Sequence, residues 1–317
     1  MGYVEEKIRE LSGVLPPLTK RPDFEDFWTG TLEQTRRVPL RPQREEYDFP
    51  CRSVKCYKVV YQGFDETPVH AWFLVPAFVS KEKYPCLIHY HGYTSTRGRP
   101  ADHLSWVMLG MAVLAPDHRD QNGETGDLSG YSSGHMFNPY TKGLLFKDEY
   151  YLRKVYMDAV KAVDFACGQP EVDTSRIVVE GGSMGGGTSL AVAALDRRPG
   201  LCLADVPSHC HLGRRLEERT GSYGAVADYL KFHPDETDRV LGTLSYFDVM
   251  NLADRIGSPV FASVGLKDTT CPAECFSAAY NRITAPKQIR AYPFNGHEGG
   301  GSIHHEEKLA FAAKFIG

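Results

Sequence analysis

The sequence contains few of the features that would indicate a membrane or nucleic-acid partner. No apolar run in its 317 residues approaches the roughly 20 residues that a membrane-spanning helix needs. Positive charge is not in excess either, because the chain has 36 lysines and arginines against 40 acidic residues and a formal net charge of −4. The sequence also has no basic stripe, so a nucleic-acid partner is not expected. Residues 1–10 are charged and lack the apolar segment of a secretory signal, so we expect a cytoplasmic protein.

The eight cysteines lack the spacings of metal-binding or redox sites. The pairs Cys51/Cys56 and Cys271/Cys275 suit neither a zinc ribbon nor a C-x-x-C motif. Most of the cysteines lie within apolar stretches, where a thiol packs as a small hydrophobic group. We therefore expect reduced core thiols, with Cys271 packing in the helix that follows it. A P-loop and a dinucleotide fingerprint are also absent, and we expect neither a metal nor an organic cofactor.

What the sequence does contain is an alternation of short apolar strands with helices. An antiparallel pair is predicted over 54–61 and 69–75, and further strands over 85–90, 112–115, 176–179, 201–206, 259–264 and 288–292. Helices are predicted over 101–110, 148–167, 272–283 and 303–315. This alternation predicts an α/β fold with a mainly parallel central sheet flanked by helices, in one domain that spans residues 1–317.

Two segments stand outside this alternation. Residues 1–45 are predicted to form a helical extension, with a helix start at Pro22-Asp23 and a solvated link at its end that includes Arg44. The apolar face of this helix consists of Phe24, Phe27, Trp28 and Leu32. Residues 207–252 are helical, polar and aromatic, and they are longer than an ordinary crossover. We expect them to be an insertion that covers the functional site.

The segment 177–187 joins a β-branched strand to an Ala-rich helix through glycines. Within it, Gly181, Ser183 and Gly185 form G-x-S-x-G, the nucleophile-elbow pattern of α/β-hydrolases. Small neighbours let strand and helix approach, and the serine oxygen is presented at the helix N-terminus, where backbone N–H groups can hold an anion. The alternative is a glycine-rich turn whose serine only caps the helix.

A serine hydroxyl needs a base, and the base needs an orienting acid. In α/β-hydrolases the acid and then the histidine follow the serine in the chain, each beyond the end of a strand. Asp268 and His297 occupy these places, so we predict a Ser183, Asp268 and His297 triad that transfers the acyl group of an ester. His304 is the alternative base, and Asp254 is a weaker alternative acid because it precedes its strand. Asp268 could also be a helix cap.

The oxyanion of such a reaction must be met by backbone N–H donors. The residue after the nucleophile, Met184, supplies one donor. The loop after an early strand should supply the second, and the N–H of Tyr93 fits this place. His91 and Gly92 precede it, and they could also be a plain strand-terminating turn.

Several motifs together resemble the acetyl xylan esterase/cephalosporin C deacetylase family, carbohydrate esterase family seven. They are H-G-Y at 91–93, D-H-R-D-Q at 117–121, the helix at 150–165, V-D-T-S-R-I at 172–177, the elbow at 181–187, L-S-Y-F-D-V-M-N at 244–251, G-L-K-D at 265–268 with C-P at 271–272, and N-G-H-E at 295–298. The resemblance extends over nearly the whole chain. It implies an α/β-hydrolase fold and an intracellular serine esterase that deacetylates short xylo-oligosaccharides and cephalosporin C.

The resemblance also implies an assembly and residue roles. Family members form ring-like homohexamers whose active sites face an internal cavity. The implied nucleophile is Ser183, with Asp268 and His297 as its partners and Tyr93 and Met184 as the oxyanion donors. Four residues are expected to support the site: His91, Gly92, Arg119 and Gln121.

The chain departs from the family pattern at two positions. Asp120 stands where the family has the glycine of Arg-Gly-Gln, and aspartate takes a positive φ less cheaply than glycine does. Met184 stands where glutamine is usual; its backbone donor remains, whereas a side-chain contact in the site would be lost. These departures concern the preferred alcohol more than the reaction itself.

Other functions remain open from sequence alone. A peptidase of the prolyl-oligopeptidase kind usually has a propeller or large cap domain, for which this chain has no room. A general small-acyl carboxylesterase would share the mechanism. A non-catalytic binding protein of the same fold would be expected to have a broken triad.

Overall fold

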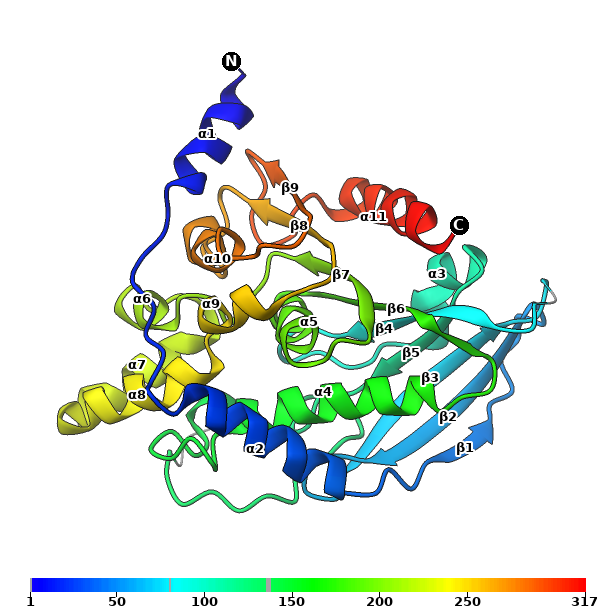
Figure 1. Ribbon diagram of the computed structural model, residues 1–317, viewed down its shortest axis with the longest axis horizontal. Coiled ribbons are helices and arrows are strands. Elements are labelled where there is room, and N and C mark those ends of the chain that lie inside the picture. Colours follow the sequence, from blue (N-terminus) through cyan, green and yellow to red (C-terminus); the bar gives the residue numbers. More distant parts are fainter. Residues whose placement is uncertain (1, 80, 135–137) are drawn as a thin grey trace.

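The computed structural model describes residues 2–79, 81–134 and 138–317, and its centre is one nine-stranded sheet (Figure 1). The strand order is β1-β2-β3-β5-β4-β6-β7-β8-β9. The strands are β1 Gln43–Glu46, β2 Val54–Gln62, β3 Pro68–Pro76, β4 Tyr84–Tyr90, β5 Ala112–Pro116, β6 Val172–Gly182, β7 Pro199–Asp205, β8 Val260–Gly265 and β9 Lys287–Tyr292. Strands β4 to β9 run parallel, and β1, β2 and β3 extend the sheet in antiparallel fashion. The predicted mainly parallel sheet is confirmed.

Helices cover both faces of this sheet. They are α1 Tyr3–Ser12, α2 Phe24–Arg37, α3 Leu104–Met108, α4 Tyr151–Cys167, α5 Met184–Leu195, α6 Leu212–Glu217, α7 Gly224–Phe232, α8 Thr237–Phe247, α9 Val249–Leu252, α10 Ala273–Tyr280 and α11 Gly301–Ile316. One core forms between the sheet and α2, α4, α5, α9 and α10, and a second core forms against α3 and α11. Because both faces are covered, the central strands are apolar along nearly their whole length.

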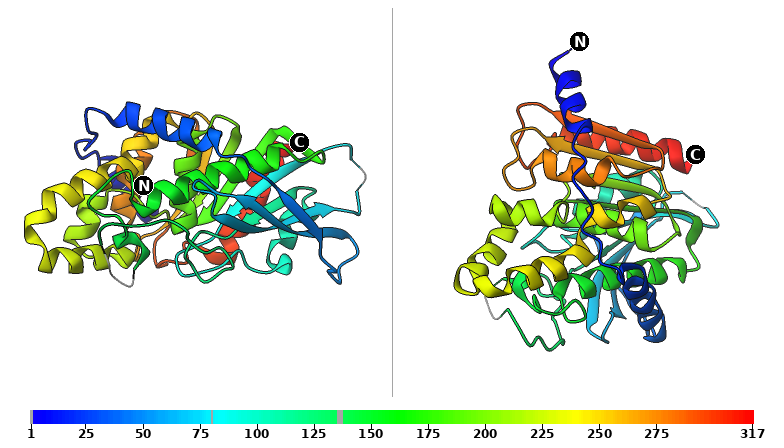
Figure 2. Two further views of the ribbon diagram at one scale, coloured as in Figure 1. Left: turned by 90° about the horizontal axis from the view of Figure 1, so that it is seen from below. Right: turned by 60° about the vertical axis from the view of Figure 1, so that its left-hand side comes forward.

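The N-terminal extension is helical as predicted, and α2 begins directly after the predicted start at Pro22-Asp23, but the extension consists of two helices at distant places. Helix α1 packs beside α10 and β9, α2 packs beside α4, and an extended segment runs between them (Figures 1 and 2). Thr19 N–H in this segment donates to Asn251 Oδ1 at 3.1 Å. Met1, the first residue of the predicted extension, lies outside the described residues.

The link predicted around Arg44 is wrong, because these residues form the edge strand β1. Gln43–Glu46 pairs with β2 in antiparallel register. The Arg44 guanidinium lies 3.6 Å from the centroid of the Tyr57 ring and pairs with Glu171 at 2.7 Å. A polar edge strand has no apolar alternation from which it could be predicted, and polar side chains at an edge guard it against pairing with other chains.

Two predicted helices differ in their details. The helix predicted over 101–110 is a 3₁₀ turn at Pro100–His103 followed by the short α3, and the helix predicted from Asp148 begins at Tyr151. The segment 207–252 is helical as predicted, as a succession of α6 to α9 and short 3₁₀ turns. In the described part of the chain, no helix combines the length and apolarity that crossing a membrane would require.

Candidate active site

Strand β6 passes into α5 through a strained residue, Ser183. Its φ is 57° and its ψ is −116°, a region that L-residues rarely adopt. The Ser183 N–H donates to the carbonyl of Asp205 at 2.9 Å, and its carbonyl accepts from Ser208 N–H at 2.9 Å. Both partners lie at the exit of β7, so the neighbouring strand holds the strained turn from both sides.

The glycines of this turn are required by close approach of the backbone. A Cβ at Gly181 would lie 2.4 Å from the carbonyl oxygen of Tyr90, and one at Gly185 would lie 1.8 Å from it. A Cβ at Gly187 would lie 2.5 Å from the carbonyl oxygen of Ser208. The G-x-S-x-G pattern thus follows from the packing of β4 and β7 against the start of α5.

Ser183, His297 and Asp268 lie in one hydrogen-bonded line. His297 Nε2 is 2.9 Å from Ser183 Oγ, and His297 Nδ1 is 2.8 Å from Asp268 Oδ2. The carboxylate can only accept, so Nδ1 carries the proton and Nε2 is free to accept the serine proton. The Asp268 side chain is fully buried, whereas the His297 side chain is 36% exposed. The arrangement suits a base that solvent and substrate can reach, held by an acid that they cannot.

The other Asp268 oxygen anchors the acid to its own loop. Asp268 Oδ1 accepts the backbone N–H groups of Thr270 at 2.8 Å and of Cys271 at 2.9 Å. Helix α10 begins at Ala273 with Pro272 as its N-cap, so Asp268 is not the helix cap of the alternative interpretation, and these bonds lie within its own loop. They also fix the direction in which its free oxygen points.

The alternative base and acid lie elsewhere. His304 Nδ1 is 3.0 Å from Tyr292 Oη, and its Nε2 is 2.9 Å from Asp205 Oδ1, in a buried place on α11. Asp254 pairs with Lys20 at 2.8 Å, and its side chain is 47% exposed. Neither takes part in the hydrogen bonds of Ser183.

The two predicted oxyanion donors flank the serine. Met184 is the first residue of α5, and Tyr93 follows Gly92, where a Cβ would lie 4.0 Å from Ser183 Cβ. Among the described residues, no hydrogen bond uses the N–H of either Tyr93 or Met184. The Met184 side chain is fully buried in the main core, so only its backbone faces the site.

His91 fixes the peptide group that bears the Tyr93 donor. Its Nε2 accepts the N–H of His118 at 2.9 Å, so its Nδ1 carries the proton and donates to the Gly92 carbonyl at 2.7 Å. Burial lowers the pKa of His91 to about 4, which keeps this tautomer neutral. The Gly92 carbonyl and the Tyr93 N–H belong to one planar peptide group, so holding the carbonyl directs the N–H.

Gln121 holds the same loop from its other side. Its Oε1 accepts the N–H of Thr94 at 2.6 Å, and its Nε2 donates to Tyr151 Oη at 2.9 Å. Tyr151 in turn donates to the carbonyl of Arg119 at 2.6 Å. Gln121 and the Arg119 carbonyl therefore support residues 91–94, the loop after β4 that carries the predicted donor Tyr93, and none of these bonds reaches the triad.

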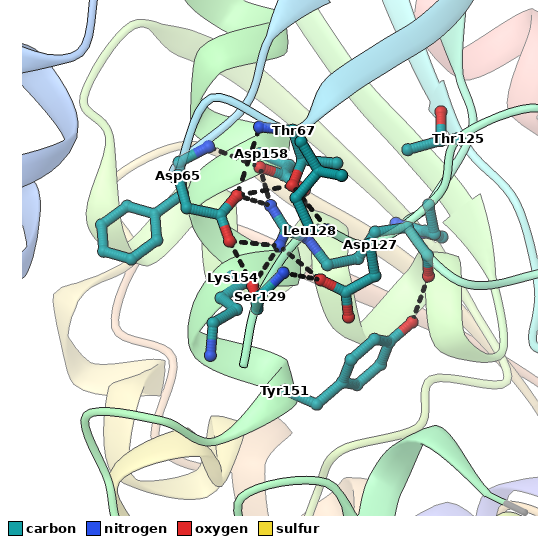
Figure 3. A network of polar contacts seen from close by, with 12 residues as sticks. Asp65, Thr67, Thr125, Asp127, Leu128, Ser129, Tyr151, Lys154 and Asp158 are labelled. Carbon is teal, nitrogen blue, oxygen red and sulfur yellow. Dashed lines mark hydrogen bonds and ion pairs between the residues drawn. The ribbon is translucent and has the colours of Figure 1, made fainter. Parts of the chain in front are cut away.

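The Arg119 guanidinium is fully buried among carboxylates that sequence reasoning did not single out. It pairs with Asp158 at 2.7 Å, Asp65 at 3.0 Å and Asp127 at 3.1 Å. Figure 3 labels these three aspartates, whose carboxylates point toward one another. Burial by itself raises the pKa of Asp65, but Arg119 holds it well below its usual range. The three aspartates come from three distant segments with no common spacing, so only the fold brings them together.

Asp120 adopts the conformation that glycine would favour, with φ at 51°. Its Oδ2 lies 2.6 Å from Lys142 Nζ. The positive φ anticipated for this position is therefore present, and an ion pair that glycine could not make accompanies it.

The helical insertion reaches the site through a row of tyrosines. The Tyr93 ring lies 5.0 Å from that of Tyr140, which stacks on Tyr223 at 4.8 Å. Tyr223 belongs to the insertion, and its hydroxyl is 2.7 Å from His209 Nδ1. These aromatic contacts connect the loop that carries Tyr93 with residues 207–252, and a cover of the site by these residues stays a prediction.

A buried ion cluster lies beneath the elbow and was also not predicted. Lys308 Nζ on α11 is 2.5 Å from Glu180 Oε1 and 2.5 Å from Asp205 Oδ2. Burial raises the pKa of Glu180, but Lys308 and His89 outweigh it and hold the pKa well below its usual range. The cluster attaches the C-terminal helix to the strands that carry Ser183 and its backbone partner.

Comparison with known proteins identifies the family. Residues 2–315 match the sequence model of the family described as acetyl xylan esterase (AXE1). The acetyl esterase Axe7A of Xylanibacter ruminicola is 29% identical over 307 residues, which cover 93% of this chain and 68% of that protein. The acetyl xylan esterase of Paenibacillus sp. R4 superposes with a TM-score of 0.93 at 38% identity, covering 98% of this chain and 99% of the other.

A second solved enzyme agrees with this comparison. Acetyl xylan esterase 1 of Thermoanaerobacterium sp. JW/SL YS485 superposes with a TM-score of 0.92 at 31% identity, covering 98% of this chain and 99% of the other. The family model, the curated relative and the solved structures thus all indicate an acetyl esterase over nearly the full length of the chain. The chain belongs to the acetyl xylan esterase family and is a carboxylic ester hydrolase of the α/β-hydrolase fold.

Proposed function

We propose that this esterase removes acetyl groups from acetylated xylo-oligosaccharides and similar small O-acetyl substrates, including cephalosporin C, through a Ser-His-Asp acyl-enzyme mechanism. The observation that carries the mechanism is the line of hydrogen bonds at 2.9 and 2.8 Å that joins Ser183, His297 and Asp268. The names of its relatives support the acetylated xylan substrate.

Acylation begins at Ser183. His297 Nε2 takes the hydroxyl proton as Oγ attacks the acetyl carbonyl carbon, and Asp268 stabilises the imidazolium that forms. The carbonyl oxygen becomes an oxyanion, which the N–H groups of Tyr93 and Met184 receive. When the tetrahedral intermediate collapses, His297 gives its proton to the departing sugar oxygen, and the acetyl group stays on Ser183.

Deacylation repeats these steps with water. His297 takes a proton from a water molecule that attacks the acetyl carbon, and the same N–H groups receive the oxyanion. Collapse breaks the bond to Ser183 Oγ, which recovers its proton from His297, and acetate leaves. The 36% exposure of the His297 side chain gives both the sugar and the water access to the base.

The test is hydrolysis of p-nitrophenyl esters from acetate to octanoate by the wild type and by Ser183→Ala. We expect turnover of acetate that falls with acyl length, and a loss of about 10⁴-fold or more in the variant. Undiminished turnover by Ser183→Ala would refute the mechanism. A preference for octanoate would contradict the acetyl specificity and favour a carboxylesterase of broader acyl range.

The natural substrate needs a separate comparison. Acetylated xylo-oligosaccharides, mono-acetylated sugars and cephalosporin C should be offered at equal concentration, with released acetate as the readout. We expect the oligosaccharides to have the highest kcat/KM. If peptide amides are cleaved faster than every ester, a peptidase is the better interpretation.

We also propose that the enzyme is a cytoplasmic homohexamer. Several large apolar side chains are exposed in the single chain, including Phe232 and Phe294 at 81% each, and assembly would cover such groups. All eight cysteines are free thiols, the state that a reducing compartment maintains. Size-exclusion chromatography with light scattering tests the assembly, and a monomer at micromolar concentration would refute it; cell fractionation tests the location.

A further inference from the structure

Arg215 on α6 is a fully buried cation with unusual partners. Its side chain is 1% exposed, and within the described residues its hydrogen bonds all go to neutral oxygens. In the described part of the chain, no carboxylate lies within ion-pair distance of it, whereas the equally buried Arg119 has three. A guanidinium buried without a counter-ion is costly, so its geometry calls for a functional explanation.

The acceptors of Arg215 belong to the loop after β7 and to the loop after β8, which carries Asp268. Nη1 donates to Ser208 Oγ at 2.6 Å, and Nη2 donates to the carbonyl of Thr270 at 2.7 Å. Ser208 N–H donates to the carbonyl of Ser183 at 2.9 Å, and Thr270 N–H donates to Asp268 Oδ1 at 2.8 Å. One guanidinium therefore connects Ser208, which hydrogen-bonds to Ser183, with Thr270, which hydrogen-bonds to Asp268.

The surroundings leave the guanidinium little freedom. It lies over the ring of Tyr223, 4.8 Å from the centroid, and its Nε donates to Thr220 Oγ1 at 3.1 Å. A Cβ at Gly221, where φ is 52°, would lie 3.0 Å from Nη2 and 2.8 Å from the Thr270 carbonyl oxygen. The absence of a side chain there lets the insertion close over the Arg215–Thr270 contact.

A buried thiol lies in the same loop as Thr270. Cys271 follows Thr270, its N–H donates to Asp268 Oδ1 at 2.9 Å, and its side chain is buried. Burial raises the pKa of this thiol, although Arg215 lowers it, so Cys271 stays protonated.

We propose that Arg215 is a positioning residue for ester hydrolysis, which holds the acid loop and the nucleophile elbow at a fixed separation and makes the triad depend on the helical insertion. The planar fork of a guanidinium reaches two acceptors at a set distance, which a lysine ammonium cannot do. The role rests on the ester hydrolysis proposed above.

The first test replaces Arg215 by methionine, which has a similar length and carries no charge to bury. We expect kcat for p-nitrophenyl acetate to fall roughly 10- to 100-fold, because a small displacement of the triad slows the chemical step. KM should stay within about threefold, because none of the hydrogen bonds of Arg215 goes to residues 91–94. Arg215→Lys should remain close to the methionine variant, and full recovery by lysine would show that charge alone matters.

A matched control separates positioning from folding. Arg153 on α4 is also buried, and it hydrogen-bonds to Thr31 Oγ1 and Gln34 Oε1 at 3.0 Å, far along the chain from the triad loops. Arg153→Met should leave kcat within about twofold. If both methionine variants lose kcat equally, a general loss of packing explains the effect and the proposal fails.

A double-mutant cycle keeps the proposal falsifiable if Arg215→Met does not fold. Ser208→Ala removes the Oγ acceptor alone, and it should lower kcat in the same direction. The Arg215→Met/Ser208→Ala double variant should lose no more than the larger single loss, because both changes break one connection. Full additivity, or a Ser208→Ala variant with wild-type kcat, would overturn the role.

The rate at which a fluorophosphonate labels Ser183 distinguishes failure of this role from failure of the proposed function, because labelling needs the triad but no acetyl ester. We expect the wild type to label quickly and Arg215→Met to label roughly 10- to 100-fold more slowly. If the wild type labels but does not hydrolyse acetyl esters, the proposed function fails and the positioning role survives. Labelling of Arg215→Met at the wild-type rate, or no labelling of the wild type, would refute the role.

Discussion

At the scale of single residues, the elbow depends on the absence of side chains. Gly185 lies in helix α5, where alanine is normally preferred, yet its Cβ would lie 1.8 Å from the Tyr90 carbonyl oxygen. We expect Gly185→Ala to lower the free energy of unfolding by at least about 3 kcal/mol and to abolish turnover. Urea unfolding followed by circular dichroism measures the first effect.

The control for this prediction is a helical glycine with space around it. Of the residues that the structure describes, none comes within 4 Å of a Cβ at Gly30 in α2. Gly30→Ala should therefore raise the free energy of unfolding by about 0.5–1 kcal/mol. Equal stabilities of the two alanine variants would contradict the argument from close approach.

Asp120 shows how one departure from the family pattern is accommodated. Alanine at this position would have to adopt the same φ of 51°, which it tolerates less well than aspartate does. It would also lose the ion pair with Lys142. We expect Asp120→Ala to destabilise the protein by about 1–2 kcal/mol. Asp120→Gly relieves the backbone and loses only a partly exposed ion pair, so its stability should stay within about 1 kcal/mol of the wild type. Thermal unfolding of both variants checks the order.

At the scale of structural elements, Arg119 holds three segments together. Asp65 lies between β2 and β3, Asp127 lies in the loop after β5, and Asp158 lies on α4. Arg119→Met would leave these carboxylates without their cation, and we expect the free energy of unfolding to fall by about 3–5 kcal/mol. Guanidinium chloride would screen charges, so urea is the proper denaturant.

Arg198 supplies the comparison for this prediction. It pairs with Asp196 at 2.5 Å and Asp164 at 2.6 Å, but its side chain is 39% exposed. Arg198→Met should lower the free energy of unfolding by no more than about 1 kcal/mol, because water replaces the lost ion pairs. If the two variants lost the same stability, burial would not be what makes the Arg119 contacts strong.

The elements that the sequence predicts well are those with a strong local pattern. Apolar runs bounded by glycine or proline indicate β4, β5 and β8, and a parallel sheet then brings the residues after its strands to one edge. That rule alone is enough to place Ser183, Asp268 and His297 near one another. Their hydrogen bonds depend on loop conformations that have no period in the sequence.

The elements that the sequence does not predict are stabilised by partners far along the chain. Strand β1 is polar and exists because β2 offers it an edge, and the extended segment between α1 and α2 is held by residues such as Asn251. Arg215 and Lys308 look like ordinary surface charges in a helix, and only the fold shows them buried. Long-range burial of polar groups carries no local signature, which is why these contacts cannot be predicted from the sequence.

At the scale of the whole molecule, stability in acid depends on histidines that the fold keeps neutral. Burial lowers the pKa of His91 and His103 to about 4 and that of His209 to about 3, and it holds the pKa of His118 well below its ordinary value. In the unfolded chain each would bind a proton near pH 6.5. Because the folded pKa values are depressed, their stabilisation is present in full above about pH 6.5 and is lost as the pH falls towards 4.

The size of this effect can be measured at His103. Its Nε2 lies 2.8 Å from the carbonyl of Arg97 and must donate there, a contact that the amide of glutamine can reproduce without titrating. We expect His103→Gln to have nearly wild-type stability at pH 7. Between pH 6.5 and 4 its free energy of unfolding should fall less steeply than that of the wild type. The two slopes should differ by about 1.4 kcal/mol per pH unit, which is the contribution of one proton. Urea unfolding at half-unit steps of pH gives both slopes. If His103→Gln kept the wild-type slope, a neutral buried His103 could not be a source of the acid sensitivity.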